Sequence, residues 1–200
     1  QTFASLEQLS DSYVAHEYLE AENAPMYLHE FTDDAGTQSL RYLADSHLGL
    51  MLPHLVAEPM RSALQGWAGD VISTEQYLDF LRCRRFRVSL LVHDDAPIER
   101  NLMAFRPDGF FVSTQAIPTP VNDAPDTAAW VVDGLHEHPT TADPAIVSAM
   151  EHARSAWPRA VAFAELLAAA EQEHPGLEDL RARLGQWMLY AHCCGVLSLH

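Results

Sequence analysis

Residues 141–200 contain three apolar runs at helical spacing, separated by proline and glycine. Asp143 followed by Pro144 joins an N-cap residue to a proline in the first turn, which predicts the start of the first helix. Two further helices are expected over 160–173 and 177–193, and a glycine after the third marks its end. The last residues, VLSLH, are expected to form a strand. This part of the chain is therefore predicted to be a small, mainly helical unit that ends in a strand.

The N-terminal part, residues 1–95, is also expected to be mostly helical, with some strand. Apolar residues at three- and four-residue spacing indicate the helices, and alternation of side chains indicates the strands. Helices are expected over 6–21, 25–36, 53–67 and 75–84, and strand-like segments over 40–48 and 85–93. Asn23 is the expected cap of the second helix, and Ser73 or Thr74 that of the fourth.

The middle of the chain alternates between strand-like and proline-rich sequence. GFFVSTQAI (109–117) predicts a strand, which we expect to pair with residues 86–92. The stretch IPTPVNDAPD (117–126) has three prolines and neither a helical nor a strand period, so it is expected to be a connecting segment. A weaker strand is expected over 129–132.

Together these patterns predict an α+β fold that is mainly helical. Residues 1–95 are expected to form a helical domain with a small β-sheet, and 96–140 a strand and a connector. Residues 141–200 show three short helices and then a strand, which is the order found in winged-helix modules. A winged-helix-like C-terminal domain is therefore predicted.

The charge of the chain restricts its partners. The formal net charge is −16, and all 12 basic residues are arginines. Residues 1–80 hold 13 acids and 2 arginines, a balance of −11. Because such a chain is repelled by phosphate backbones and anionic lipids, neither nucleic acid nor a membrane is an expected partner. Three cysteines, two of them adjacent, do not make a disulfide framework and indicate a cytoplasmic protein.

Motifs that would hold a cofactor or a nucleophile are missing from the sequence. No GxGxxG, GxxxxGK[ST], GxSxG, HExxH or CxxC occurs, so no catalytic residue, no cofactor and no metal site is predicted. Two histidine-containing groups leave a metal-dependent enzyme open as a lesser alternative. One is His136 and His138 around Glu137, and the other is His192 beside the cysteine pair.

The run RCRRFR (82–87) is the one basic cluster of the sequence. We expect its arginines to pair with acids of residues 1–80, or with Glu75 and Asp79 on the preceding helix. A nucleic-acid patch is a lesser alternative because no second basic element supports it. A peptide, a cofactor or another domain also stays open as its partner.

Two segments, 16–46 and 75–93, resemble the family called the predicted methyltransferase regulatory domain. The shared pattern is a Tyr-Leu pair, a proline followed by tyrosine and a His-acid-Phe, a Leu-x-Tyr-Leu, and then EQYxDFxRxRxFR. Ser39 and Ser89 depart from it, where the family tends to have glycine and threonine. The candidate interaction residues are His29, Glu30, Tyr42, Gln76, Tyr77, Asp79, Arg84, Arg85 and Arg87.

The rest of the chain resembles, more weakly, the winged-helix region that follows this domain in bacterial protein lysine methyltransferases. The resemblance implies a non-catalytic regulatory or substrate-presenting region, with a Rossmann-type catalytic domain upstream on the same chain or on a partner. A basic protein substrate is a further expected partner, because the acidic N-terminal part would attract it. The alternative is a winged-helix DNA-binding regulator.

Overall fold

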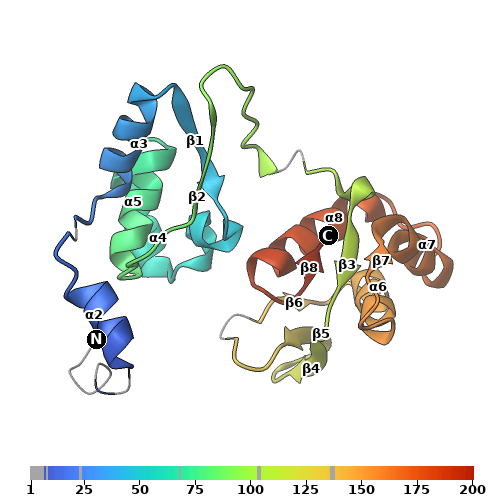
Figure 1. Ribbon diagram of the computed structural model, residues 1–200. Helices are drawn as coiled ribbons and strands as arrows, with labels where there is room; N and C mark the ends of the chain where they lie inside the picture. The colour runs from blue at the N-terminus through green and yellow to red at the C-terminus, as the bar shows by residue number, and fades with distance from the viewer. Residues whose placement is uncertain (1–6, 8, 23, 68, 103–104, 136–137) are drawn as a thin grey trace.

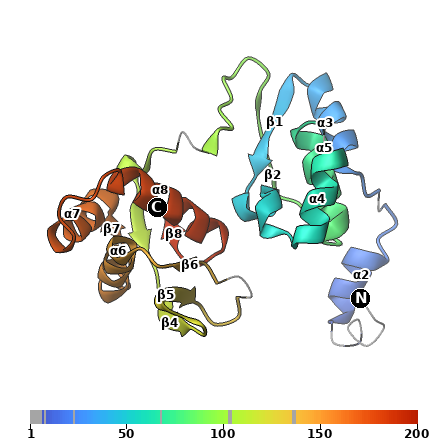
Figure 2. The same ribbon diagram turned by 180° about the vertical axis from the view of Figure 1, so that it is seen from behind.

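The computed structural model describes all residues except 1–6, 8, 23, 68, 103–104 and 136–137, and it has two lobes, which are distinct in both views (Figure 1 and Figure 2). The first lobe contains helices α2 to α5 and strands β1 and β2, and the second contains the remaining helices and strands. Within the described residues there are seven α-helices and three small antiparallel sheets, so the fold is α+β. None of the described helices is both long and apolar enough to cross a lipid bilayer.

The first lobe is a two-stranded sheet with helices packed beside it. Its elements are α2 (Asp11–Tyr18), α3 (Leu28–Thr37), β1 (Leu40–Asp45), α4 (Glu58–Trp67), α5 (Val71–Leu81) and β2 (Ser89–His93), with short 3-10 turns η1 (Leu48–Met51) and η2 (Pro53–Leu55). Strands β1 and β2 run antiparallel, with Leu40 opposite His93 and Asp45 opposite Ser89. Helices α3 and α5 pack on each other, and Leu28, Leu64 and Leu78 are buried in this lobe.

The second lobe has three helices and two three-stranded sheets. Its elements are the 3-10 turn η4 (Pro107–Gly109), β3 (Phe111–Ser113), β4 (Ile117–Val121), β5 (Ala124–Val131), β6 (Thr140–Thr141), α6 (Pro144–Ser155), β7 (Val161–Ala162), α7 (Phe163–Glu173), α8 (Leu180–Cys193) and β8 (Ser198–Leu199). The strand orders are β7-β3-β8 and β4-β5-β6.

The core of the second lobe confirms the helical faces predicted for the C-terminal part. Ile146, Met150, Leu167 and Leu184 are buried together in one apolar cluster. That cluster also includes Trp130 of β5 and Val112 of β3, so the middle strands share a core with the three helices. The proposed domain limits at 95 and 140 stay a prediction, as does the winged-helix assignment.

The pairing predicted for the strand over 109–117 is wrong. Within this range the strand β3 pairs with β7 and β8, with Val112 opposite both Val161 and Leu199. Residues 86–92 instead end in β2, whose partner is β1. Because Val112 is fully buried in the second core, pairing β3 with β7 and β8 satisfies its backbone while its side chain leaves water.

The prediction that 117–126 is a connector is also wrong, because β4 and β5 form a hairpin there. Asp123 turns the chain in the left-handed region, with φ of 68°. Pro118 and Pro120 fit because β4 is the edge strand of its sheet, where a missing N–H removes no ladder bond that the fold needs. The weaker strand expected over 129–132 is confirmed as part of β5.

Several helix limits differ from those predicted, mainly at helix starts. Among the described residues α2 begins only after Ser10, whose side chain accepts the backbone N–H of Tyr13, and it has no buried residue. Helix α3 begins three residues later than Pro25, and Asn23 lies outside the described residues. The predicted helix over 53–67 is a 3-10 turn followed by α4, and α5 starts earlier than predicted because Asp70 caps it.

Candidate functional site

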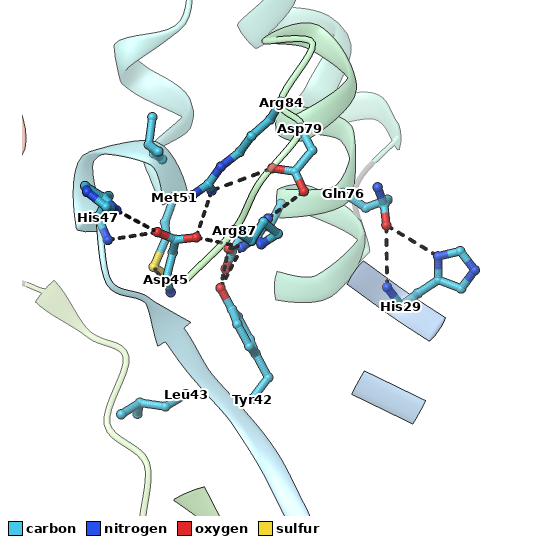
Figure 3. Close-up of polar contacts among 12 residues, drawn as sticks. His29, Tyr42, Leu43, Asp45, His47, Met51, Gln76, Asp79, Arg84 and Arg87 are labelled. Carbon is cyan, nitrogen blue, oxygen red and sulfur yellow. Dashed lines mark hydrogen bonds and ion pairs between the residues drawn. The ribbon is translucent and has the colours of Figure 1, made fainter. Parts of the chain in front are cut away.

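Six side chains of the first lobe form a buried polar group that we call the Arg–acid cluster (Figure 3). Strand β1 and helix α5 supply two residues each, and the extended segment between α5 and β2 supplies the arginines. The members are Tyr42, Asp45, Glu75, Asp79, Arg84 and Arg87. On α5 the two acids lie four residues apart, so they share one face of the helix.

Arg87 lies at the centre of the cluster. Its Nη1 donates to Oδ2 of Asp79 at 2.7 Å, and its Nη2 donates to Oη of Tyr42 at 2.8 Å and also to Oε2 of Glu75. The hydroxyl of Tyr42 donates to that same Glu75 oxygen at 2.6 Å. One guanidinium group therefore ties β1 and α5 to the start of β2.

Arg84 closes the other side of the cluster. Its Nη1 lies 2.7 Å from Oδ2 of Asp45 and 3.8 Å from Oδ1 of Asp79. The Asp45 side chain is fully buried, and its other oxygen accepts the backbone N–H of His47 at 2.8 Å. Charged groups buried in this way are stable only when opposite charges and hydrogen bonds compensate them.

The surroundings of the cluster hold its groups in fixed protonation states. Burial and the hydrogen bond to Glu75 raise the pKa of Tyr42 well above its ordinary value, so its hydroxyl stays protonated. Burial would raise the pKa of Asp45, but Arg84 and the His47 N–H outweigh it, and the pKa is lowered. Burial likewise opposes the charge of Arg87, but hydrogen bonds to Asp79 and Glu75 prevail and raise its pKa.

The cluster joins three segments by mutual pairing of its own charged groups. With three carboxylates and two guanidinium groups, its formal charge is −1. This confirms the prediction that arginines of the run 82–87 pair with acids of residues 1–80. The other two arginines of the run bond elsewhere, Arg82 to the carbonyl oxygen of Leu50 and Arg85 to the hydroxyl of Tyr18 at 3.1 Å.

The structure brings some of the predicted interaction residues together and separates others. Tyr42, Asp79, Arg84 and Arg87 are in the cluster. The backbone N–H and the ring Nδ1 of His29 each lie 3.4 Å from Oε1 of Gln76, next to the cluster on α5 (Figure 3).

Glu30, Tyr77 and Arg85 lie outside the cluster. Glu30 accepts the Tyr27 backbone N–H at 2.7 Å and so caps its own helix, and Tyr77 packs edge-on against Phe80. Asp45 was missed as a site residue, although an acid at the end of a mostly apolar strand was a usable sign. Glu75 was named only as a pairing partner of the arginines and as a motif residue.

Two adjoining cavities open beside the cluster, with volumes of about 240 and 270 Å³. Both are lined by Met26, Tyr27, Leu28, Arg85 and Arg87. Tyr27 contacts Phe80 edge-on at 5.6 Å between ring centroids. These cavities combine aromatic walls with arginine side chains.

A larger cavity, of about 420 Å³, lies between the lobes and is lined by residues that include His47, Arg82, His192 and Cys193. Burial, and to a lesser degree the neighbouring Cys194, raises the pKa of the Cys193 thiol to about 11, so the thiol is protonated at neutral pH. Within the described part of the chain, no three His, Cys, Asp or Glu side chains are grouped to hold a metal ion. The alternative group around Glu137 lies partly outside the described residues.

Comparison with known proteins relates this site to methyltransferases. Residues 10–93, which contain the whole Arg–acid cluster, match the family described as the predicted methyltransferase regulatory domain. An uncharacterized protein of Rickettsia prowazekii (strain Madrid E), RP789, is 41% identical over 101 residues, which are 48% of this chain and 17% of that protein.

Solved structures extend the similarity over both lobes. PKMT2 from Rickettsia typhi is similar over 98% of this chain with 25% identity, at a TM-score of 0.74. PKMT2 in complex with AdoHcy gives a TM-score of 0.75 at the same identity. In both comparisons this chain spans only 40% of the PKMT2 chain.

Proposed function

We propose that these 200 residues are a non-catalytic regulatory or substrate-presenting region of an S-adenosylmethionine-dependent protein methyltransferase. The observation behind the proposal is the match of residues 10–93 to a methyltransferase regulatory family, in a chain that resembles 40% of PKMT2. The catalytic domain would lie outside this region, on the same polypeptide or on a partner. We call the protein or complex that unites the two the parent methyltransferase, and we place it in the cytoplasm.

The chemistry of the Arg–acid cluster supports this proposal. A general base or nucleophile must be free to meet a substrate atom, and its pKa must lie near the working pH. In the cluster, Tyr42 is held protonated and Arg87 is held charged, and both bond to Glu75. Such an arrangement is suited to fixing β1 against α5, and thereby to presenting a rigid surface.

The second lobe is proposed to be winged-helix-like. Helices α6 to α8 supply the three-helix order, and β7-β3-β8 a short sheet. Helix α8 would be the recognition helix of a DNA-binding module, but Arg181 already pairs with Asp108, and Arg183 pairs with Asp143 at 2.8 Å. This pairing favours a protein contact over DNA.

Calorimetry with AdoHcy tests the assignment of the catalytic domain. The 200-residue chain should give no binding heat with AdoHcy, whereas the parent methyltransferase should bind it with a 1:1 stoichiometry. The zinc-free and zinc-supplemented chain should behave alike, since no metal is proposed. Stoichiometric binding of AdoHcy by the 200-residue chain would overturn the proposal.

The acidic surface of the first lobe supports a role in attracting a basic protein substrate. Three of its acids are in the Arg–acid cluster, whereas Asp33 and Asp34 on α3 are exposed to solvent. Their field would speed encounters with a lysine-rich protein. We therefore expect Asp33→Asn with Asp34→Asn to slow methylation of such a substrate by the parent methyltransferase at low salt.

A matched control removes two charges from the second lobe. Glu171→Gln with Glu173→Gln changes two exposed acids of α7 and should leave the rate nearly unchanged. The difference between the two double variants should disappear at high salt, where charges are screened. Equal methylation rates for all variants at low salt would refute the idea that the acidic surface attracts the substrate.

A further inference from the structure

The outward face of β2 and of the segment before it is apolar and uncovered. Phe86, Val88 and Leu90 occupy alternate positions and are 65%, 56% and 42% exposed. Arg87, which lies between the first two, is turned inward into the Arg–acid cluster. We call these three residues the apolar stripe.

The apolar stripe reverses the usual pattern of a half-buried sheet. An antiparallel sheet with one covered face normally places apolar residues inward and polar residues outward. Here the inward position of Arg87 is charged, and the three outward positions are apolar. Because backbone alternation has period two, the buried pairing of Arg87 with Glu75 and Asp79 fixes Phe86 and Val88 on the outer side.

Most of the exposed large hydrophobic residues lie in the part of the chain that matches the family. Of the 14 large hydrophobic residues exposed in the described structure, 10 lie before residue 94 and four after it. The exposed fractions of the apolar stripe are those in the chain with both lobes present, so the second lobe does not cover the stripe. A contiguous exposed apolar surface in a soluble domain marks a contact site.

We propose that the apolar stripe is the surface on which the catalytic domain of the parent methyltransferase packs. This inference rests on the proposed function. PKMT2, which this chain resembles over 98% of its length, is matched over only 40% of its own chain, so such a relative has a further part available to pack on the stripe.

Charge argues against two other possible occupants of the apolar stripe. A second copy of this chain would bring a formal charge of −16 against another −16, which opposes self-association. A lysine-rich substrate would be attracted to exposed acids such as Asp33 and Asp34, whereas the stripe offers no acid at its outward positions. A domain that offers an apolar surface, as proposed for the catalytic domain, fits the stripe best.

Hydroxyl-radical labelling with mass spectrometry tests the proposal on intact proteins. Labelling of Phe86 and Leu90 should fall about tenfold between the 200-residue chain and the parent methyltransferase, as expected for side chains that enter the dry centre of an interface. Phe111, exposed on β3 to 51%, serves as the control and should be labelled alike in both.

A matched pair of variants of the parent methyltransferase tests the contact directly. Val88→Thr places a hydroxyl on the stripe while keeping the shape and strand preference of the side chain. Ile117→Thr makes the same kind of change at another exposed strand position, which is 63% exposed. We expect Val88→Thr to weaken docking about tenfold, or roughly 1.4 kcal/mol, which from a tenfold-protected state raises labelling of Phe86 about fivefold. Ile117→Thr should leave that labelling unchanged.

Equal labelling of Phe86 in the 200-residue chain and in the parent methyltransferase would overturn the docking proposal. Protection of Phe86 in the 200-residue chain that increases with concentration would also overturn it, because a second copy would then be the occupant. The proposed function has a separate measure, since AdoHcy binding is assayed independently. If only the parent binds AdoHcy while Phe86 stays exposed, the docking surface is wrong and the regulatory assignment stands.

Discussion

Replacing Arg87 by methionine should destabilise the first lobe strongly. The substitution keeps an unbranched side chain about as long as the aliphatic part of arginine but removes the contacts to Glu75, Asp79 and Tyr42. Arg84 would then be the one cation left in the Arg–acid cluster to face three carboxylates. Removing one partner of a buried ion pair costs about 3–5 kcal/mol, because the other charge stays buried without compensation.

Counting the hydrogen bonds of Arg87 gives a similar magnitude. Bonds to charged groups contribute about 1.5–3 kcal/mol each, and Arg87 makes two of them, to Asp79 and Glu75. The sum, about 3–6 kcal/mol, is a large part of the 5–15 kcal/mol that is typical for a whole domain. Urea unfolding followed by far-ultraviolet circular dichroism should therefore show a much lower midpoint for the variant.

The control and the pH dependence separate charge from packing. The control is Arg159, which is 62% exposed and pairs with Glu165 at 3.5 Å. Arg159→Met should lower the free energy of unfolding by at most about 1 kcal/mol. Protonation neutralises buried carboxylates that have lost their cation. The loss in free energy of unfolding caused by Arg87→Met should therefore become smaller as the pH falls from neutrality. If Arg87→Met lowers the free energy of unfolding by less than about 1 kcal/mol, or by an amount that does not change with pH, this account of the Arg–acid cluster is refuted.

Two further predictions concern the contact between the lobes and the acid stability of the first lobe. An added Cβ at Gly49 would lie 2.0 Å from the carbonyl oxygen of Cys193, so Gly49→Ala should loosen the contact between the lobes and speed proteolysis between them. An added Cβ at Gly36 has free space, so Gly36→Ala should stabilise α3 by about 0.5–1 kcal/mol. The lowered pKa of Asp45 gives a stability contribution that is present above the ordinary carboxyl pKa and is lost as the pH falls through the folded value. Urea titrations below about pH 4 should therefore show a shallower loss of stability for Asp45→Asn than for the wild type, although at neutral pH the variant is less stable by roughly 1–3 kcal/mol; parallel curves would contradict it.

Local features of the sequence were sufficient to predict most elements. The start of α6 at Asp143 and Pro144 follows from capping alone, since these residues need no distant partner. Glu75 and Asp79 lie four residues apart on one helix, so their pairing with nearby arginines was also predictable. Helix starts were less predictable, because several residues near each start can act as the cap.

Contacts between distant segments depended on the tertiary structure. Asp45 reaches Arg84 because β1 and β2 pair with Asp45 opposite Ser89, and nothing near Asp45 in the sequence names that partner. The pairing of β3 with β7 and β8 likewise depended on which core buries Val112.

The sequence by itself determined the character of the chain: acidic overall, of mixed helix and strand, with an arginine run placed beside acids. Only the tertiary structure decided that the alternation around Arg87 points charge inward and the apolar stripe outward. The physical reason is that alternation states which residues share a face, whereas burial of one face depends on what packs against it. Here α5 supplies the two acids that hold Arg87 inside.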